Sequence, residues 1–108
     1  MNNRSYDGGV MKLDNKDLLF RLSEFYKIFC DSTRLRILDV LMDNSLCVNE
    51  ISELLNISQS AISHQLRYLR NSNLVKSIKN GKNVYYSISD HHIKTIIKYG
   101  VEHILEVI

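Results

Sequence analysis

The order of elements in the second half of the chain most constrains its fold. A helix pattern over about 59–71 is followed by two runs that alternate apolar and polar residues, Leu74–Ile78 and Val84–Ile88. Asn80-Gly81 stands between the runs and is a strong signal for a hairpin turn. A shorter helix pattern precedes the long one. This order predicts a winged helix-turn-helix, a mainly α fold with a small β-hairpin.

Charge is concentrated in the same part of the chain. Residues 54–89 contain no acidic side chain, although the whole chain has a formal net charge of only +2. A basic block flanked by acidic segments is typical of a surface that faces nucleic-acid phosphates. The segment carries five basic side chains, which are Arg67, Arg70, Lys76, Lys79 and Lys82.

Hydrophobic periodicity predicts five helices in all. The second helix has an apolar stripe that includes Leu35, Leu38, Leu41 and Met42. The expected ranges and caps are 16–29, a second helix capped by Asp31 or Ser32, Val48–Leu55, 59–71 capped by Ser58, and 90–108 capped by Asp90.

A length of 108 residues predicts a single folded domain. We expect residues 1–13 to form a disordered N-terminal tail and residues 14–108 to form the domain. The chain has no apolar run long enough to span a membrane and no secretory signal, which predicts a cytoplasmic protein. Its two cysteines, Cys30 and Cys47, do not make a disulfide framework.

The fourth helix has two different faces. Ile62, Leu66 and Leu69 form a stripe that should pack against the third helix. The other face carries small, amide and basic side chains that suit the edges of DNA bases. An ordinary solvated helix face is the alternative, but the acid-free context and the hairpin favour DNA. The candidate DNA-binding residues on this face are Gln59, Ser60, Ser63, His64 and Arg67.

Two lysines, Lys79 and Lys82, flank the tip of the expected hairpin. At that position they would reach phosphates beside the groove. The alternative is that they serve solubility alone.

The last helix is too apolar for a solvated surface. Its isoleucines and valine spread over one broad arc, and Gly100 would let another backbone approach closely. We expect this helix, together with the first, to form the interface of a homodimer. The arc consists of Ile93, Ile96, Ile97, Val101, Ile104 and Ile108.

The chain resembles the ArsR/SmtB family of metal-responsive winged-helix repressors over residues 18–107. The resemblance is carried by an ordered set of motifs: DSTRLRILDVL, SLCVNEISELL, SQSAISHQLRYLRNSNLV, GKNVYYSI and DHHIKTIIKYGVEHILE. It implies a homodimer that binds palindromic operator DNA and is released by its effector. It also places Gln59, Ser60, Ser63 and His64 where the recognition helix of the family meets DNA.

Members of this family sense metals at different places. Thiolate sensors carry Leu-Cys-Val-Cys at the third helix, whereas this chain has Leu46-Cys47-Val48-Asn49 and lacks the second cysteine. We therefore interpret Cys47, even with Glu50 nearby, as a remnant and Cys30 as a small buried residue.

Some zinc and cobalt sensors of the family carry Asp-x-His-x10-His-x2-Glu on the last helix. This chain matches that spacing without departure, and the resemblance implies a metal site made of Asp90, His92, His103 and Glu106.

Helix geometry shows how these four residues could meet. His92, His103 and Glu106 share one stripe, but the two histidines are separated by roughly 16 Å of helix rise. A zinc ion needs ligands at about 2.0–2.2 Å, so one helix cannot close the site. An antiparallel partner would complete it and give two equivalent sites per dimer, for zinc, or for cobalt or another divalent metal. His91 points away from the stripe.

Each ligand residue alone has a plain structural interpretation. Asp90 could serve only as an N-cap, His92 could be part of a polar helix start, His103 a surface or interface histidine, and Glu106 a solvated carboxylate. Their joint occurrence in register favours metal.

The sequence is compatible with different functions to different degrees. The leading hypothesis is a metal-released repressor, and the alternative is a winged-helix repressor regulated by Cys30 or Cys47 thiol chemistry without a metal effector. An enzyme is not expected, because the sequence has no His-Glu-x-x-His, phosphate loop or nucleophile motif. A binding module without an effector would not respond to a metal titration.

Overall fold

The computed structural model describes residues 4–7, 10–13 and 15–106, with side chains described from residue 15 onward. Contacts divide the chain into two compact units, Met1–Ser32 and Thr33–Ile108. The expected single domain from residue 14 therefore includes parts of both units.

The first unit contains a small hairpin and the first helix. Strand β1 (Arg4–Asp7) pairs antiparallel with β2 (Val10–Leu13). These strands lie in the segment expected to be a disordered tail, and the boundary at residue 14 stays a prediction. In the sequence a Gly-Gly pair separates the two strands, and such a pair is also a hairpin signal.

Helix α1 (Lys16–Lys27) continues into a 3-10 turn, η1 (Ile28–Cys30), where the sequence predicts one helix over 16–29. The Asn15 side chain caps α1, because its Oδ1 accepts hydrogen bonds from the backbone N–H groups of Asp17 at 2.8 Å and Leu18 at 3.2 Å.

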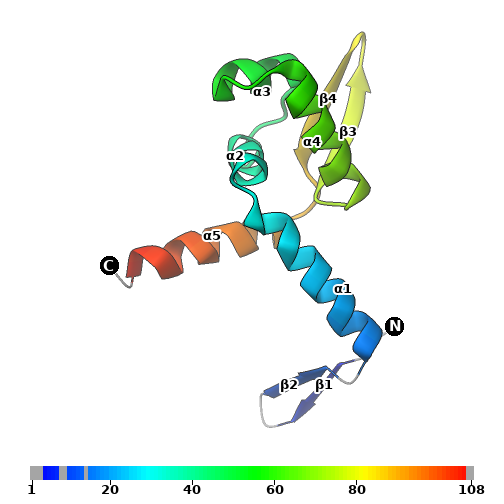
Figure 1. Cartoon of the computed structure of the whole chain (residues 1–108), viewed down its shortest axis with the longest axis vertical. Helices are drawn as coiled ribbons and strands as arrows, with labels where there is room; N and C mark the ends of the chain where they lie inside the picture. The colour runs from blue at the N-terminus through cyan, green and yellow to red at the C-terminus, as the bar shows by residue number, and fades with distance from the viewer. Residues whose placement is uncertain (1–3, 8–9, 14, 107–108) are drawn as a thin grey trace. The chain divides into compact units, whose positions relative to one another are not determined.

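The second unit is a winged helix-turn-helix, as the sequence predicts (Figure 1). Helix α3 packs on α4, and α4 packs on the first strand of the hairpin. The described chain has five α-helices and, in this unit, one two-stranded antiparallel sheet. The elements are α2 (Ser32–Val40), α3 (Val48–Leu55), α4 (Gln59–Asn71), β3 (Val75–Asn80), β4 (Asn83–Ile88) and α5 (His91–Glu106).

The core joins every element of this unit. The predicted stripe of α4 is fully buried. Helix α2 also contributes two fully buried side chains, Ile37 and Leu38. The prediction for α2 was partly wrong. Leu35 is 39% exposed, whereas Ile37, which was left out of the stripe, is fully buried. The two residues lie about 200° apart around the helix, so only one of them can face the core. The core side chains are Ile37, Leu38, Leu41, Ile51, Ile62, Leu66, Leu69, Leu74, Val75, Ile88 and Ile93.

The hairpin β3–β4 is longer than the two runs seen in the sequence. Pairing extends from Val75↔Ile88 to Asn80↔Asn83, which leaves Gly81-Lys82 as the turn. Gly81 has φ of +66°, a value suited to the first central position of a tight hairpin turn. The glycine, rather than the asparagine, therefore occupies the turn itself.

A loop is tied to the outer edge of β4. The backbone N–H of Leu46 donates to the carbonyl of Tyr86 at 3.0 Å, and the N–H of Tyr86 donates back to Leu46 at 2.8 Å. This bridge fixes Tyr86 from the side opposite β3.

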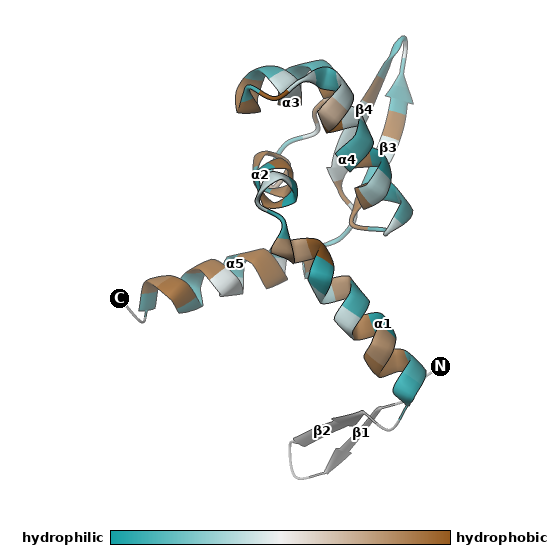
Figure 2. Ribbon diagram, in the orientation of Figure 1, coloured by the Kyte–Doolittle hydropathy of each residue, from teal (hydrophilic) through white to brown (hydrophobic). Residues whose placement is uncertain are grey.

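Helix α5 begins at Asp90, which caps it as expected. The Oδ1 atom accepts hydrogen bonds from the backbone N–H groups of His92 at 2.9 Å and Ile93 at 3.3 Å. Much of the helix consists of apolar residues (Figure 2). Toward its end, Ile104 is 60% exposed and Leu105 is 65% exposed. Ile108, which was included in the apolar arc, lies outside the described residues. Among the helices that the structure describes, none is long and apolar enough to cross a membrane.

Candidate functional site

Local hydrogen bonds fix the turn between α3 and α4. Asn56 ends α3 in the left-handed conformation, with φ 56° and ψ 48°. Ser58 then caps α4, because its Oγ accepts from the backbone N–H of Ala61 at 3.2 Å. The guanidinium of Arg36 donates to the carbonyl of Leu55 at 2.8 Å and satisfies the end of α3. The helix-turn-helix is therefore held by polar residues of its own turn and by Arg36 of α2.

The candidate recognition residues lie on α4 outside its buried stripe. Ser63 is half-buried, and the other members of the set are exposed. Gln59 Nε2 donates to Asn49 Oδ1 at 2.8 Å, which links the first turns of α4 and α3. Contact of these residues with DNA stays a prediction. The exposed members are Gln59, Ser60, His64 and Arg67.

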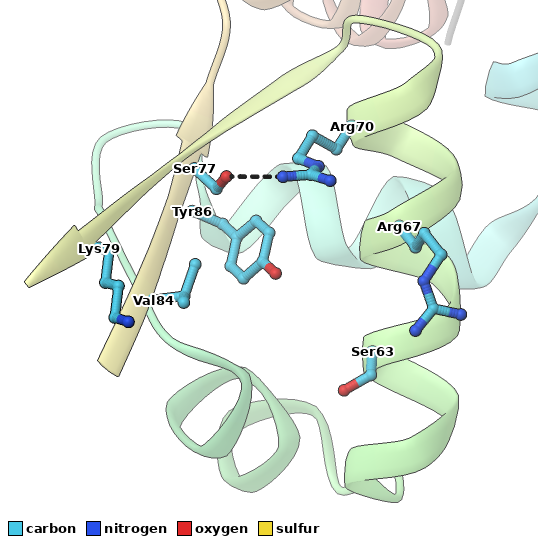
Figure 3. Close-up of a pocket in the computed structure, with 7 residues that line it drawn as sticks. All are labelled: Ser63, Arg67, Arg70, Ser77, Lys79, Val84 and Tyr86. Carbon is cyan, nitrogen blue, oxygen red and sulfur yellow. Dashed lines mark hydrogen bonds between the residues drawn. The ribbon is translucent and has the colours of Figure 1, made fainter. Parts of the chain in front are cut away.

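A hollow of about 440 Å³ lies between α4 and the hairpin (Figure 3). Of the predicted DNA-binding residues, Ser63, Arg67 and Lys79 line it, and Lys82 is an exposed residue of the turn. Arg70 and Tyr86, which were not among the predicted DNA-binding residues, also line the hollow. The spacing of Arg70, three residues after Arg67 on one helix, could have indicated its position.

The structure brings two of the four candidate metal ligands together. Asp90 Oδ1 lies 3.3 Å from His92 Nδ1 at the start of α5. His103 and Glu106 lie in the last turns of the same helix and are exposed. Within the part of the chain that the structure describes, no group of three or more candidate ligands comes together.

The surroundings of Asp90 lower the pKa of its carboxyl. Partial desolvation raises the pKa of its carboxyl, but hydrogen bonds from the N–H groups of Ile93 and His92 and the charge of the His92 ring outweigh that effect. The net pKa lies below the ordinary value of 3.8, so the group is a carboxylate at neutral pH.

The spacing of Asp90 and His92 fits a tetrahedral metal ion. Two ligands that each lie about 2.0–2.1 Å from such an ion are about 3.3–3.4 Å apart. The 3.3 Å between Asp90 Oδ1 and His92 Nδ1 has that length. The neighbouring His91 ring stacks on His92 at 4.2 Å and lines a separate hollow between α2 and α5. The pair could thus provide half of a site, and His103 and Glu106 of another chain could provide the rest.

The cysteines occupy different surroundings. The backbone N–H of Cys47 donates to Glu50 Oε1 at 3.0 Å, so Glu50 serves the start of α3. The interpretation of Cys30 as buried was wrong. Cys30 is exposed, because it ends the 3-10 turn while Ile28 takes the buried position. Its Sγ lies 3.7 Å from the carbonyl oxygen of Tyr26.

A polar-faced helix held by a helix-turn-helix, with a basic hairpin beside it, defines a DNA-binding protein of the winged-helix class. Residues 31–77 match a family described as "Bacterial regulatory protein, arsR family". The chain belongs to this ArsR/SmtB family, which consists of DNA-binding transcriptional regulators and not of enzymes.

Relatives cover most of the chain. It is 38% identical over 97 residues to a transcriptional repressor SmtB homolog from Synechocystis, spanning 90% of this chain and 71% of that protein. It is 36% identical to a cadmium resistance transcriptional regulatory protein CadC homolog from Staphylococcus aureus, spanning 80% and 72%. The structure of HlyU from Vibrio cholerae superposes with a TM-score of 0.72 at 34% identity, over 79% of this chain and 92% of that one.

Proposed function

We propose that the protein is a homodimeric repressor that binds palindromic operator DNA and is released when zinc, or a similar divalent metal such as cobalt, binds at the dimer interface. The observation that carries this proposal is the Asp90–His92 pair, spaced like two ligands of one tetrahedral ion, with His103 and Glu106 on the same helix. The relatives described as a repressor and as a cadmium resistance regulator support it.

The exposed apolar residues of two helices support dimerisation. On α5, Val101, Ile104 and Leu105 are each at least half exposed, and on α1 Leu19 and Phe20 are as well. Apolar surface of this extent on a small chain usually marks an interface. An antiparallel pair of α5 helices would place His103 and Glu106 of one chain beside Asp90 and His92 of the other.

Each site would then take two nitrogen and two oxygen ligands, and a symmetric dimer would hold two sites. A bound divalent cation supplies two positive charges and a fixed ligand geometry. Asp90 would offer an ionised carboxylate, and both imidazoles must be neutral to act as ligands.

A two-fold dimer would also present two copies of α4 about one DNA turn apart, roughly 34–36 Å, and would favour an inverted repeat. Metal binding would fix the two α5 helices relative to each other. Because these helices form the dimer interface, this would change the relative positions of the two α4 recognition helices. By linkage, metal and DNA each weaken the affinity for the other by the same factor, typically worth about 1–3 kcal/mol.

A zinc titration of a protein–DNA complex tests this proposal. The probe is a duplex selected from a random library by the wild-type protein in the presence of a chelator. Zinc should release the wild-type protein. His103→Ala should bind the duplex with wild-type affinity but resist release, because the site loses one nitrogen ligand.

His91→Ala is the matched control, since it removes a neighbouring imidazole that lies off the ligand stripe. It should be released like the wild type. If zinc strengthened binding to the duplex, or if His103→Ala were released normally, the proposed mechanism would be wrong.

Exposure of Cys30 favours one second candidate, a repressor regulated by thiol chemistry. In that case alkylation or oxidation, and not chelation, would control DNA binding. Cys30→Ser would then abolish the response and His103→Ala would leave it intact, the reverse of the result expected for the metal-released repressor.

A further inference from the structure

On one face of the hairpin, the side chains change from apolar and buried at the base to exposed at the tip. The paired residues on this face are Val75 with Ile88, then Ser77 with Tyr86, then Lys79 with Val84. The first pair is buried, the second is half-buried, and the third is exposed. The hydroxyl pair and the tip lysine line the hollow beside α4, so this face turns toward the recognition helix (Figure 3).

The opposite wall of the hollow is one stripe of α4. Ser63, Arg67 and Arg70 are spaced i, i+4 and i+7, which places them on one side of the helix. All three line the hollow. Figure 3 shows the Ser63 hydroxyl directed toward the hairpin, and the Tyr86 hydroxyl directed toward α4.

Two contacts hold this arrangement in place without any ligand. Arg70 Nη1 donates to Ser77 Oγ at 3.4 Å and connects the last turns of α4 to β3. The backbone N–H and carbonyl of Tyr86 both bond to Leu46, and Ser77 lies opposite Tyr86 in the β3–β4 register. A site whose donors are already positioned loses little side-chain entropy on binding.

The chemistry of the hollow selects an anion. Three cationic side chains, Arg67, Arg70 and Lys79, meet hydroxyl groups there, and no residue between 54 and 89 is acidic. Arginine forks and hydroxyl donors suit phosphate oxygens. The hollow continues the face of α4 that would enter the major groove, so the anion nearest to it would be the DNA backbone.

We propose that this hollow holds one backbone phosphate of duplex DNA, with Arg70 and Tyr86 as binding residues alongside Lys79. The inference rests on the proposed DNA binding and adds the contact that fixes the wing against the recognition helix. It assigns to Arg70 a phosphate contact, not a base contact.

The salt dependence of binding to a duplex of arbitrary sequence tests this site, because phosphate contacts need no specific bases. Fluorescence anisotropy with a labelled duplex would give the slope of log K against log [KCl] for each protein. Arg70→Gln should lower the magnitude of the slope by about 0.9 per protomer and weaken binding at all sequences alike. Tyr86→Phe should weaken binding with little change of slope, because it removes a neutral donor.

Lys76→Gln is the matched control. Lys76 carries the same charge as Arg70 and lies on β3, but alternation places it on the hairpin face away from α4. Equal slopes for Arg70→Gln and Lys76→Gln would overturn the site, since both variants lose one positive charge. Circular dichroism melting would confirm that the variants fold.

Two further outcomes separate this inference from others. If the wild-type protein bound no duplex at all, the proposed function would fail and the site with it. If inorganic phosphate bound the free wild-type protein at submillimolar concentration, and Arg70→Gln abolished that binding, the hollow would be a site for a small anion, and the DNA assignment would be wrong.

Discussion

Asp90 illustrates how one side chain can hold two roles. Its Oδ1 accepts the N–H groups of His92 and Ile93 and so starts α5. The same oxygen lies 3.3 Å from the His92 ring, at the separation of two ligands on a tetrahedral ion. The cap alone would explain an aspartate at this position. The metal assignment therefore depends on the residues that accompany it, and above all on His103.

At Cys47 the structure favours a structural role. Glu50, the other candidate ligand there, accepts the backbone N–H of Cys47 at the start of α3. Cys47→Ser should therefore leave zinc-induced release from operator DNA nearly unchanged, and serine is itself a good N-cap. The measurement is the zinc midpoint for release, compared with wild type and with His103→Ala. A complete loss of response in Cys47→Ser would move the sensor to α3.

In the proposed complex, two elements, α4 and the hairpin β3–β4, would contact DNA. Helix α4 offers a polar face backed by a fully buried stripe, so its exposed side can change without loss of the core. The hairpin stands beside it and shares the hollow with Arg67 and Arg70. This division predicts that the first turns of α4 read bases while its last turns and the wing bind phosphates.

The double variant Ser63→Ala/His64→Ala tests the first half of this division. It should lose most of its preference for the selected operator over a scrambled duplex, because each lost base contact removes about 1–3 kcal/mol of discrimination. Binding to the scrambled duplex should persist. Ser87→Ala, on the hairpin face away from α4, is the control and should keep full preference. Full operator discrimination by the double variant would show that these residues do not read the sequence.

Local patterns predicted the elements well, because α3, α4 and the hairpin are marked by caps, periodicity and a turn dipeptide. Ser58 and Asp90 act as caps as the sequence indicates. Features that depend on distant residues were missed. The Leu46–Tyr86 bridge joins residues forty positions apart, and no local sequence pattern predicts it. The hollow depends on that bridge and on the register of β3 with β4, so the role of Tyr86 emerged only from the structure.

At the scale of the whole molecule, the candidate metal site requires more than one chain. Asp90 and His92 begin α5, whereas His103 and Glu106 end it, roughly 16 Å further along the axis. The apolar residues exposed on α5 offer the surface by which a second copy could bring the other half of the ligand set. Regulation would then be a property of the dimer, since neither chain alone could bind the metal tightly.

Complementation between two inactive variants tests this account most directly. His92→Ala and His103→Ala homodimers should each bind zinc weakly, because both of their sites lack one imidazole. In a mixed dimer, the His103→Ala chain supplies Asp90 and His92, the His92→Ala chain supplies His103 and Glu106, and one site is intact. After the two proteins are mixed under exchanging conditions, about half of the dimers should be mixed ones, each with one tight zinc site. Zinc titration against a chromophoric chelator should therefore recover about one tight site per two dimers. If mixing restored no tight zinc binding although mixed dimers had formed, the site would not lie between the two chains.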